Sequence, residues 1–169
     1  MKTSICFFWF TQFSILFLFI CGAVWVTGCT VPGSSIEVKQ APEASLNRYK
    51  IVAVDVTTKD ADFNPNQVDF MTKCIVEQLR ESARFVKVYD INSSTEHDAD
   101  LKLSVFVEFV LLYNVKSIES SVTLTDTADG KARATALVNA HSESALLGGQ
   151  MTNAIAKLSG QIVHFVTQR

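Results

Sequence analysis

Residues 49–91, YKIVAVDVTTKDADFNPNQVDFMTKCIVEQLRESARFVKVYDI, contain two apolar runs separated by a helical pattern. The first run, residues 49–56, is apolar almost throughout, which is typical of a strand covered on both faces. The second run, residues 85–91, has the β-branched and aromatic content of a strand. Because residues 65–83 between them are long enough for a crossover helix, the stretch predicts a βαβ unit with two parallel strands.

The helix of this unit has clear start signals. Asn64 is a favoured N-cap residue, Pro65 follows at the first helical position, and Gln67 stands where a capping box requires it. Apolar residues then recur at helical spacing on one face: Val68, Met71, Ile75, Leu79 and Ala83. This pattern predicts an amphipathic helix over residues 65–83 that packs on a sheet.

The C-terminal half predicts three further strands and a second helix. Three segments alternate apolar and polar side chains, as strands with one buried face do: residues 101–113, 116–125 and 132–141. Asp129-Gly130 predicts a tight hairpin, and the apolar stripe over residues 151–166 predicts a helix. We therefore expect an α+β two-layer domain, with a mixed five-stranded sheet in the order β-α-β-β-β-β-α and two helices on one face.

The N-terminus has the pattern of a secretory signal. Lys2 precedes an apolar run over residues 5–26, and small residues end this run. The segment Val26-Thr27-Gly28-Cys29 resembles the lipobox of bacterial lipoproteins. An uncleaved membrane anchor over the same apolar run is the alternative, since 22 residues of helix reach roughly 33 Å.

The lipobox resemblance implies cleavage before Cys29, with Val26, Thr27 and Gly28 recognised by the signal peptidase. It also implies diacylglycerol on the Cys29 sulfur and an acyl chain such as palmitate on the new N-terminus, and several chains together anchor a protein stably. Thr30 stands where an Asp retains related lipoproteins in the inner membrane, so the resemblance implies an outer-membrane anchor facing the periplasm, with the inner membrane as the alternative. We expect three regions: a signal peptide (1–28), the lipidated cysteine with a flexible tether (29–47) and a periplasmic domain (48–169).

Composition excludes some classes of partner. The chain of 169 residues has 15 basic and 17 acidic side chains, a formal net charge of −2, and no basic stripe of the kind that nucleic acid requires. Of its four cysteines, two lie in the signal and Cys29 is assigned to lipid, which leaves Cys74. We therefore expect no internal disulfide, although the compartment is oxidising.

The polar clusters of the chain each fit a structural role better than a chemical one. Residues 96–100 concentrate metal-capable groups, but nothing elsewhere completes a ligand set, so a solvated loop is expected. Residues 126–130 lack the ligand positions of a calcium loop and fit turn chemistry. His141 and His164 are isolated, and Cys74 lies beside an apolar stripe, as a small buried hydrophobe does. We predict no metal site, no cofactor and no catalytic residue.

One apolar group breaks the alternation of the third strand. Phe106, Val110 and Leu112 lie on the face opposite the expected core, where an antiparallel sheet normally carries polar residues. A contiguous exposed apolar surface usually marks a contact site. We predict a docking patch for a partner or a second copy, with the alternative that the tether or a loop covers these residues.

The motifs together resemble a known group of proteins. After the lipobox, Ala99-Asp100-Leu101 opens a long strand, Asp129-Gly130-Lys131 stands at a hairpin, and Leu146-Leu147-Gly148-Gly149 precedes an amphipathic helix. This arrangement is similar to a family of uncharacterised proteobacterial lipoproteins classed as a domain of unknown function, and more distantly to the α+β domain of curli-secretion and Tol-associated periplasmic proteins. The family has no established catalytic residues, so the resemblance implies none here.

Three functional hypotheses follow. The first is a lipid-anchored, non-enzymatic binding or scaffolding module of the cell envelope, whose partners are the membrane, through the lipid, and envelope proteins or a second copy. The second is a subunit of a multimeric secretion or envelope-assembly complex, as the curli-secretion resemblance implies. The third is a small periplasmic hydrolase, since a Ser-His-Asp arrangement is recognised by geometry rather than by sequence position.

Overall fold

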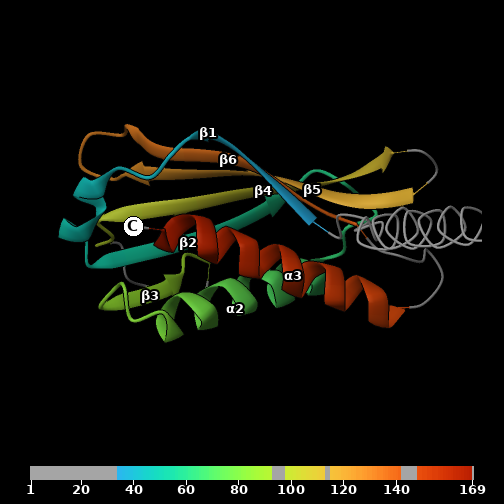
Figure 1. The fold of residues 1–169 in the computed structure, drawn as a ribbon. Helices are drawn as coiled ribbons and strands as arrows, with labels where there is room; N and C mark the ends of the chain where they lie inside the picture. The colour runs from blue at the N-terminus through green and yellow to red at the C-terminus, as the bar shows by residue number, and fades with distance from the viewer. Residues whose placement is uncertain (1–33, 93–97, 113–114, 142–147, 169) are drawn as a thin grey trace, which may run out of the picture. The chain divides into compact units, whose positions relative to one another are not determined.

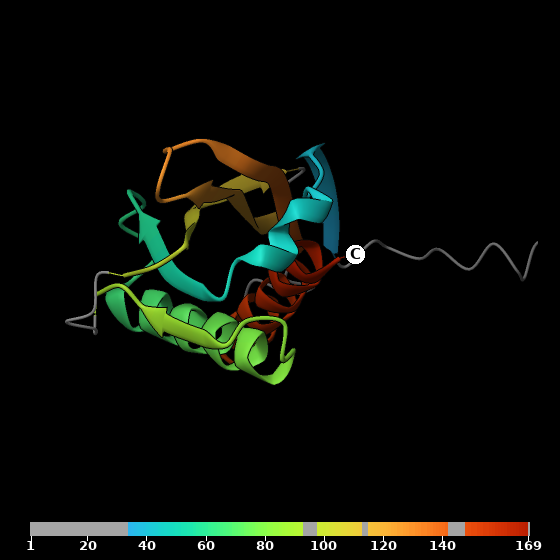
Figure 2. The ribbon, with the colours of Figure 1, turned by 90° about the vertical axis from the view of Figure 1, so that its left-hand side faces the viewer.

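The computed structural model describes residues 34–92, 98–112, 115–141 and 148–168, which belong to one compact unit. Its elements in chain order are β1 (Ser34–Gln40), the 3-10 helix η1 (Ala44–Arg48), β2 (Ile51–Thr58), α2 (Pro65–Glu81), β3 (Lys87–Asp90), β4 (Leu101–Leu112), β5 (Val115–Asp126), β6 (Ala132–His141) and α3 (Gly148–Thr167). Helices α2 and α3 form one layer and a sheet forms the other (Figures 1 and 2). The predicted α+β two-layer architecture is confirmed.

The sheet is mixed and has the strand order β1-β6-β5-β4-β2-β3. β2 runs parallel to both of its neighbours, with Ile51 opposite Lys87 of β3 and Val52 opposite Leu101 of β4. The remaining pairs are antiparallel. The predicted parallel pairing of the two strands that flank α2 is therefore confirmed.

The sheet has six strands, and the prediction of five strands is wrong. The additional strand β1 occupies residues that the sequence analysis assigned to a tether, and it pairs with β6, with Ser34 opposite Ala140. The apolar-polar alternation that would predict a strand there is short, because it has only two apolar residues, Ile36 and Val38. Of these two, only Ile36 packs against the core. Pairing with β6 overrides this weak local preference.

The core lies between the helices and one face of the sheet. Val54, Leu103 and Leu124 lie side by side on adjacent strands, and all three are fully buried. β6 contributes small side chains to the same face, which let α3 approach the sheet: Ala134, Ala136 and Ala140. Burying one Leu or Ile side chain completely contributes about 1.5–3 kcal/mol, so the packing of this face against the two helices stabilises the domain.

Local hydrogen bonds define the start of α2. The Asn64 side chain accepts from the Gln67 backbone N–H at 3.0 Å, and the Gln67 side chain accepts from the Asn64 backbone N–H at 2.9 Å. The predicted capping box is therefore confirmed. The helix ends at Glu81, two residues earlier than predicted, because Ala83 adopts a left-handed backbone with φ of 52°.

Aspartates fix the two ends of the sheet. The Asp100 carboxylate accepts from the backbone N–H groups of Lys50 at 2.7 Å and Ile51 at 2.9 Å. At the other end, the Asp60 carboxylate accepts from the Phe109 backbone N–H at 3.0 Å.

No helix within the described ranges is long and apolar enough to cross a membrane.

Candidate functional site

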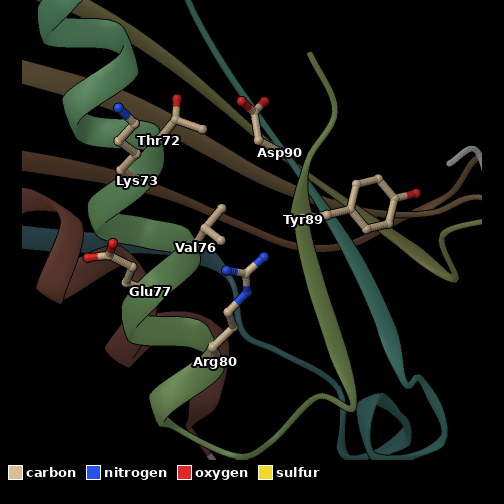
Figure 3. A pocket seen from close by; sticks show the side chains of 7 residues that line it. All are labelled: Thr72, Lys73, Val76, Glu77, Arg80, Tyr89 and Asp90. Atoms are coloured by element: carbon tan, nitrogen blue, oxygen red, sulfur yellow. The ribbon is translucent and has the colours of Figure 1, made fainter. Parts of the chain in front are cut away.

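An open cavity of about 410 Å³ lies between α2 and β3, and we call it the α2–β3 groove (Figure 3). β3 is an edge strand of only four residues and pairs with β2 on one side. The side chains that line the groove are Thr72, Lys73, Val76, Glu77, Arg80, Tyr89 and Asp90. The groove therefore lies between one face of α2 and the edge strand β3.

Arg80 closes one end of the α2–β3 groove. Its Nε donates to the Val88 carbonyl oxygen at 3.0 Å, and its Nη2 donates to the same oxygen at 2.8 Å. Figure 3 shows the Arg80 side chain reaching from the helix into the space beside β3. An edge strand exposes backbone groups that can pair with another chain, and a charged side chain placed there is a common protection.

The walls of the α2–β3 groove carry both signs of charge. Lys73 and Glu77 are exposed on α2, and Asp90 lies on the α2 side of β3, whereas the Tyr89 ring points away from the helix (Figure 3). The Thr72 hydroxyl donates to the Val68 carbonyl oxygen at 2.8 Å. The lining of the groove is therefore mixed in charge and in polarity.

Cys74 lies on α2 and is half-buried. Burial raises the pKa of the Cys74 thiol, and the nearby Glu77 carboxylate raises it further. A nucleophilic cysteine needs an electropositive setting that favours the thiolate. Cys74 therefore has the setting of an unreactive thiol, as predicted, although it is less buried than expected.

A second polar cluster surrounds Asp126 at the end of β5. The Tyr49 hydroxyl donates to Asp126 Oδ2 at 2.5 Å, and Arg133 Nη2 donates to the same oxygen at 2.9 Å. Arg133 Nη2 also contacts Asp129 Oδ2 at 2.6 Å, and Arg48 Nη2 donates to the Tyr49 hydroxyl oxygen at 2.6 Å. These bonds join the segment after η1 to the β5–β6 hairpin.

The contacts of Asp126 favour its charged form. The hydrogen bond from Tyr49 lowers the pKa of the Asp126 carboxyl well below its usual range, and the Ala128 backbone N–H and Arg133 lower it further. The Ala128 N–H reaches Asp126 Oδ1 at 2.9 Å. Asp126 is therefore an ionised carboxylate whose oxygens are committed to hydrogen bonds, which is the setting of a structural group rather than of a general base.

The turn after Asp126 behaves as predicted. The Gly130 N–H donates to the Asp126 carbonyl oxygen at 2.9 Å, and Gly130 has a positive φ of 68°.

Among the described residues no group of three or more His, Cys, Asp or Glu side chains could hold a metal ion. Asp100 binds backbone N–H groups, and His164 is exposed on α3.

The predicted docking patch is placed only in part. Phe106 is half-buried on the sheet face away from α2 and α3, opposite Ser121, which is in turn opposite Leu137 of β6. Val110 and Leu112 lie on β4 in the register that puts them on the same face, but their side chains lie outside the described residues. The structure thus adds Leu137, which alternates with buried residues on β6.

Several predicted sites lie outside the described residues. These are the lipobox residues Val26, Thr27, Gly28 and Cys29, together with His97 and the side chain of His141.

The sequence did not predict the hydrogen-bond partners of Asp126 and of the Val88 carbonyl oxygen. Tyr49 is 77 residues from Asp126, and no local pattern connects them. Arg133 gave a weak signal, because it stands four residues after Asp129 across a predicted turn.

Comparison with known proteins shows the fold. No protein-family model and no curated protein matches the sequence. The PelC dodecamer of Paraburkholderia phytofirmans is 14% identical, with a TM-score of 0.58 over 80% of this chain and 99% of that chain. XCC0632 of Xanthomonas campestris, a DUF330 protein, is 15% identical, with a TM-score of 0.51 over 75% and 87%. The lipoprotein GNA1162 of Neisseria meningitidis is 15% identical, with a TM-score of 0.42 over 70% and 99%. The expected similarity to proteins of a domain of unknown function is thus confirmed at the level of the fold.

Proposed function

We propose that this protein is a lipid-anchored lipoprotein of the cell envelope that self-associates and acts as a non-enzymatic scaffolding subunit. The observation that carries the proposal is the fold that this domain shares with PelC, which forms a dodecamer. Because 99% of that chain is covered, the shared part is the whole assembling unit and not an accessory domain.

The N-terminal motif supports the anchor. The small residue Gly28 precedes Cys29 at the end of a long apolar run, as cleavage and acylation of a lipoprotein require. Diacylglycerol plus an amide-linked acyl chain gives stable membrane attachment. We place the protein in the outer membrane facing the periplasm, on the analogy of Thr30, and the inner membrane is the alternative.

The engagement of the charged groups supports a structural role. Asp60, Asp100 and Asp126 accept hydrogen bonds from backbone N–H groups, and Arg80 donates to a backbone carbonyl. Such groups position loops and strand ends and are committed to the fold. A general acid or base must instead be within reach of a substrate proton.

The sheet face that α2 and α3 leave open offers a surface for a second copy. Phe106 and Leu137 are separated by one strand, which places their backbones about 10 Å apart, and exposed Ser121 lies between them. Neither helix lies on this face (Figure 2). Apolar side chains on an otherwise Ser- and Thr-rich face fit a modest protein contact.

Crosslinking in membranes tests this function. Cells that produce the full chain would be treated with a short amine-reactive crosslinker, and the products would be separated by mass. A ladder that ends at one defined multiple of the chain supports the proposal. A monomer that crosslinks to a different envelope protein would instead favour an adaptor, for which the α2–β3 groove is the candidate binding surface.

A further inference from the structure

The sheet ends in two different edge strands. β1 forms one edge and β3 forms the other. The helix layer contacts both edges, since the Gln161 side chain of α3 donates to the Ser34 hydroxyl oxygen at 2.6 Å and the Arg80 side chain of α2 donates to the Val88 carbonyl oxygen. Edge strands carry backbone groups that can pair with another chain. A second copy of the domain could therefore extend the sheet at either edge.

Exposed apolar side chains lie at these two edges. Among the described residues, the large hydrophobic side chains that are exposed are Val38 at 44% and Val86 at 80%. Val38 belongs to β1, and Val86 directly precedes β3. Apolar side chains at a sheet edge favour pairing with another chain. Because each edge has one such residue, the distribution favours a contact between unlike edges of two copies.

The strand directions define how the two edges would meet. β3, β2, β4 and β6 run in one direction, whereas β5 and β1 run in the other. A second copy that keeps its helices on the same side and its strands in the same orientation therefore places its β3 antiparallel to β1. Such a contact joins two unlike surfaces, and contacts of this kind close into a ring when the rotation between copies permits.

One register of this antiparallel pair matches apolar side chains on the helix side of the sheet. If Val38 lies opposite Val86, then Ile36 lies opposite Val88, because antiparallel partners change in opposite directions along the chain. Val88 belongs to the core under the helices, and Ile36 packs against that core. In this register the apolar surface of the domain continues from one copy into the next.

The same register matches opposite charges on the other face. Glu37 then lies opposite Lys87, and both residues are exposed. Opposite charges directly across an antiparallel strand pair stabilise it. Glu37 contacts Lys39 at 2.7 Å within its own strand, with both side chains more than half exposed, and such a solvated pair contributes little. Glu37 can therefore exchange this contact for one with Lys87 of a second copy.

The backbone groups agree with this register. The Lys87 N–H donates to the Lys50 carbonyl oxygen, so the next residue, Val88, directs its backbone groups away from β2. Followed through the strand registers across the sheet, the same alternation directs the backbone groups of Ile36 away from β6. Ile36 and Val88 can therefore exchange both hydrogen bonds of an antiparallel pair.

We propose that β1 of one copy pairs antiparallel with β3 of the next copy, with Val38 opposite Val86 and Glu37 opposite Lys87. This inference rests on the self-association in the proposed function and names its contact. Arg80 already donates to the Val88 carbonyl oxygen and competes with the neighbouring β1 for it. The contact is therefore weaker than one at an unprotected edge.

A disulfide between copies tests the inference. Two versions of the full chain, one with Val38→Cys and one with Val86→Cys, would be produced together in a Cys74→Ser background, with tags of different mass. Mild oxidation and non-reducing electrophoresis then measure the linked product. The matched control replaces Val86→Cys by Ala128→Cys, because Ala128 is exposed in the turn after β5. We expect the first pair to give severalfold more linked product than the control pair.

Charge reversal gives a second measurement on the same disulfide. Glu37→Lys and Lys87→Glu each place like charges opposite each other, so each alone should lower the yield of linked product severalfold. The two substitutions together restore opposite charges and should restore the yield. Both side chains are exposed, so neither substitution changes the core. A yield that ignores both reversals would contradict the register.

Other outcomes overturn the inference. Equal linkage of the test pair and the control pair would contradict an edge contact, and efficient linkage of Val38→Cys to itself would mean that like edges meet. Amine-reactive crosslinking is measured on the same samples. If a crosslinked ladder forms without a disulfide between positions 38 and 86, only the edge contact fails. If no ladder forms and the protein is a monomer, the proposed self-association fails.

Discussion

The Tyr49 hydroxyl and the Asp126 carboxylate form a hydrogen bond of 2.5 Å that connects the start of the βαβ unit to the last hairpin. This bond, with the Ala128 N–H and Arg133, keeps the pKa of Asp126 well below its usual range. A depressed carboxyl pKa contributes stability above the unfolded-state pKa of about 3.9, and that stability is lost as pH falls toward the folded-state value.

Tyr49→Phe removes one of these donors, so the folded-state pKa of Asp126 should move toward its ordinary value. We expect the variant to melt at a lower temperature than the wild type at pH 7, with the difference shrinking below about pH 4. Thermal melts from pH 7 to pH 2 measure this. In an Asp126→Asn background the same substitution should show no such pH dependence, and two parallel curves in the original background would argue against the assignment.

Arg80→Ala uncovers the Val88 carbonyl oxygen at the edge of the sheet. The loss of this contact should lower the free energy of unfolding by about 1 kcal/mol and promote concentration-dependent association through β3. Urea unfolding and sedimentation at rising protein concentration check both effects. Lys73→Ala is the control, because Lys73 lines the same groove on the same helix. Equal behaviour of the two variants would mean that Arg80 does not protect the edge.

Asn64→Ala removes the N-cap of α2 and half of its capping box. We expect a loss of about 1 kcal/mol in the free energy of unfolding, read from the urea midpoint with an unchanged slope. Asn66→Ala is the matched control, since Asn66 is exposed inside the first turn and helix propensity favours Ala there. A midpoint that does not move for Asn64→Ala would contradict the role of the cap.

Phe106→Ser tests the sheet face opposite α2 and α3 as a contact surface. We expect the crosslinked ladder to weaken while folding stability falls by only about 1 kcal/mol, as for a substitution outside the core. Ser104→Ala, on the same face of the same strand, should leave the ladder unchanged. A loss of stability as large as that of Leu103→Ala, about 2–5 kcal/mol, would place Phe106 in the interior and refute the contact.

Features coded by neighbouring residues were predictable from the sequence. The start of α2 is set within four residues, by Asn64, Pro65 and Gln67. The apolar-polar alternation of β4 identifies its buried residues, which are Leu101, Leu103, Val105 and Val107. β1 was missed, because its pairing with β6 depends on residues about 100 positions later and only Ile36 packs against the core. The α2–β3 groove and the Tyr49–Asp126 bond were missed for the same reason, since each joins segments that only the folded chain brings together.

The central claim is a lipid-anchored subunit that self-associates, and native mass spectrometry of the full chain released from membranes tests it most directly. We expect a complex whose mass is an integral multiple, greater than one, of the mass of a chain that begins at Cys29 and carries acyl groups. An unmodified chain that is detected as a monomer would contradict both the anchor and the assembly.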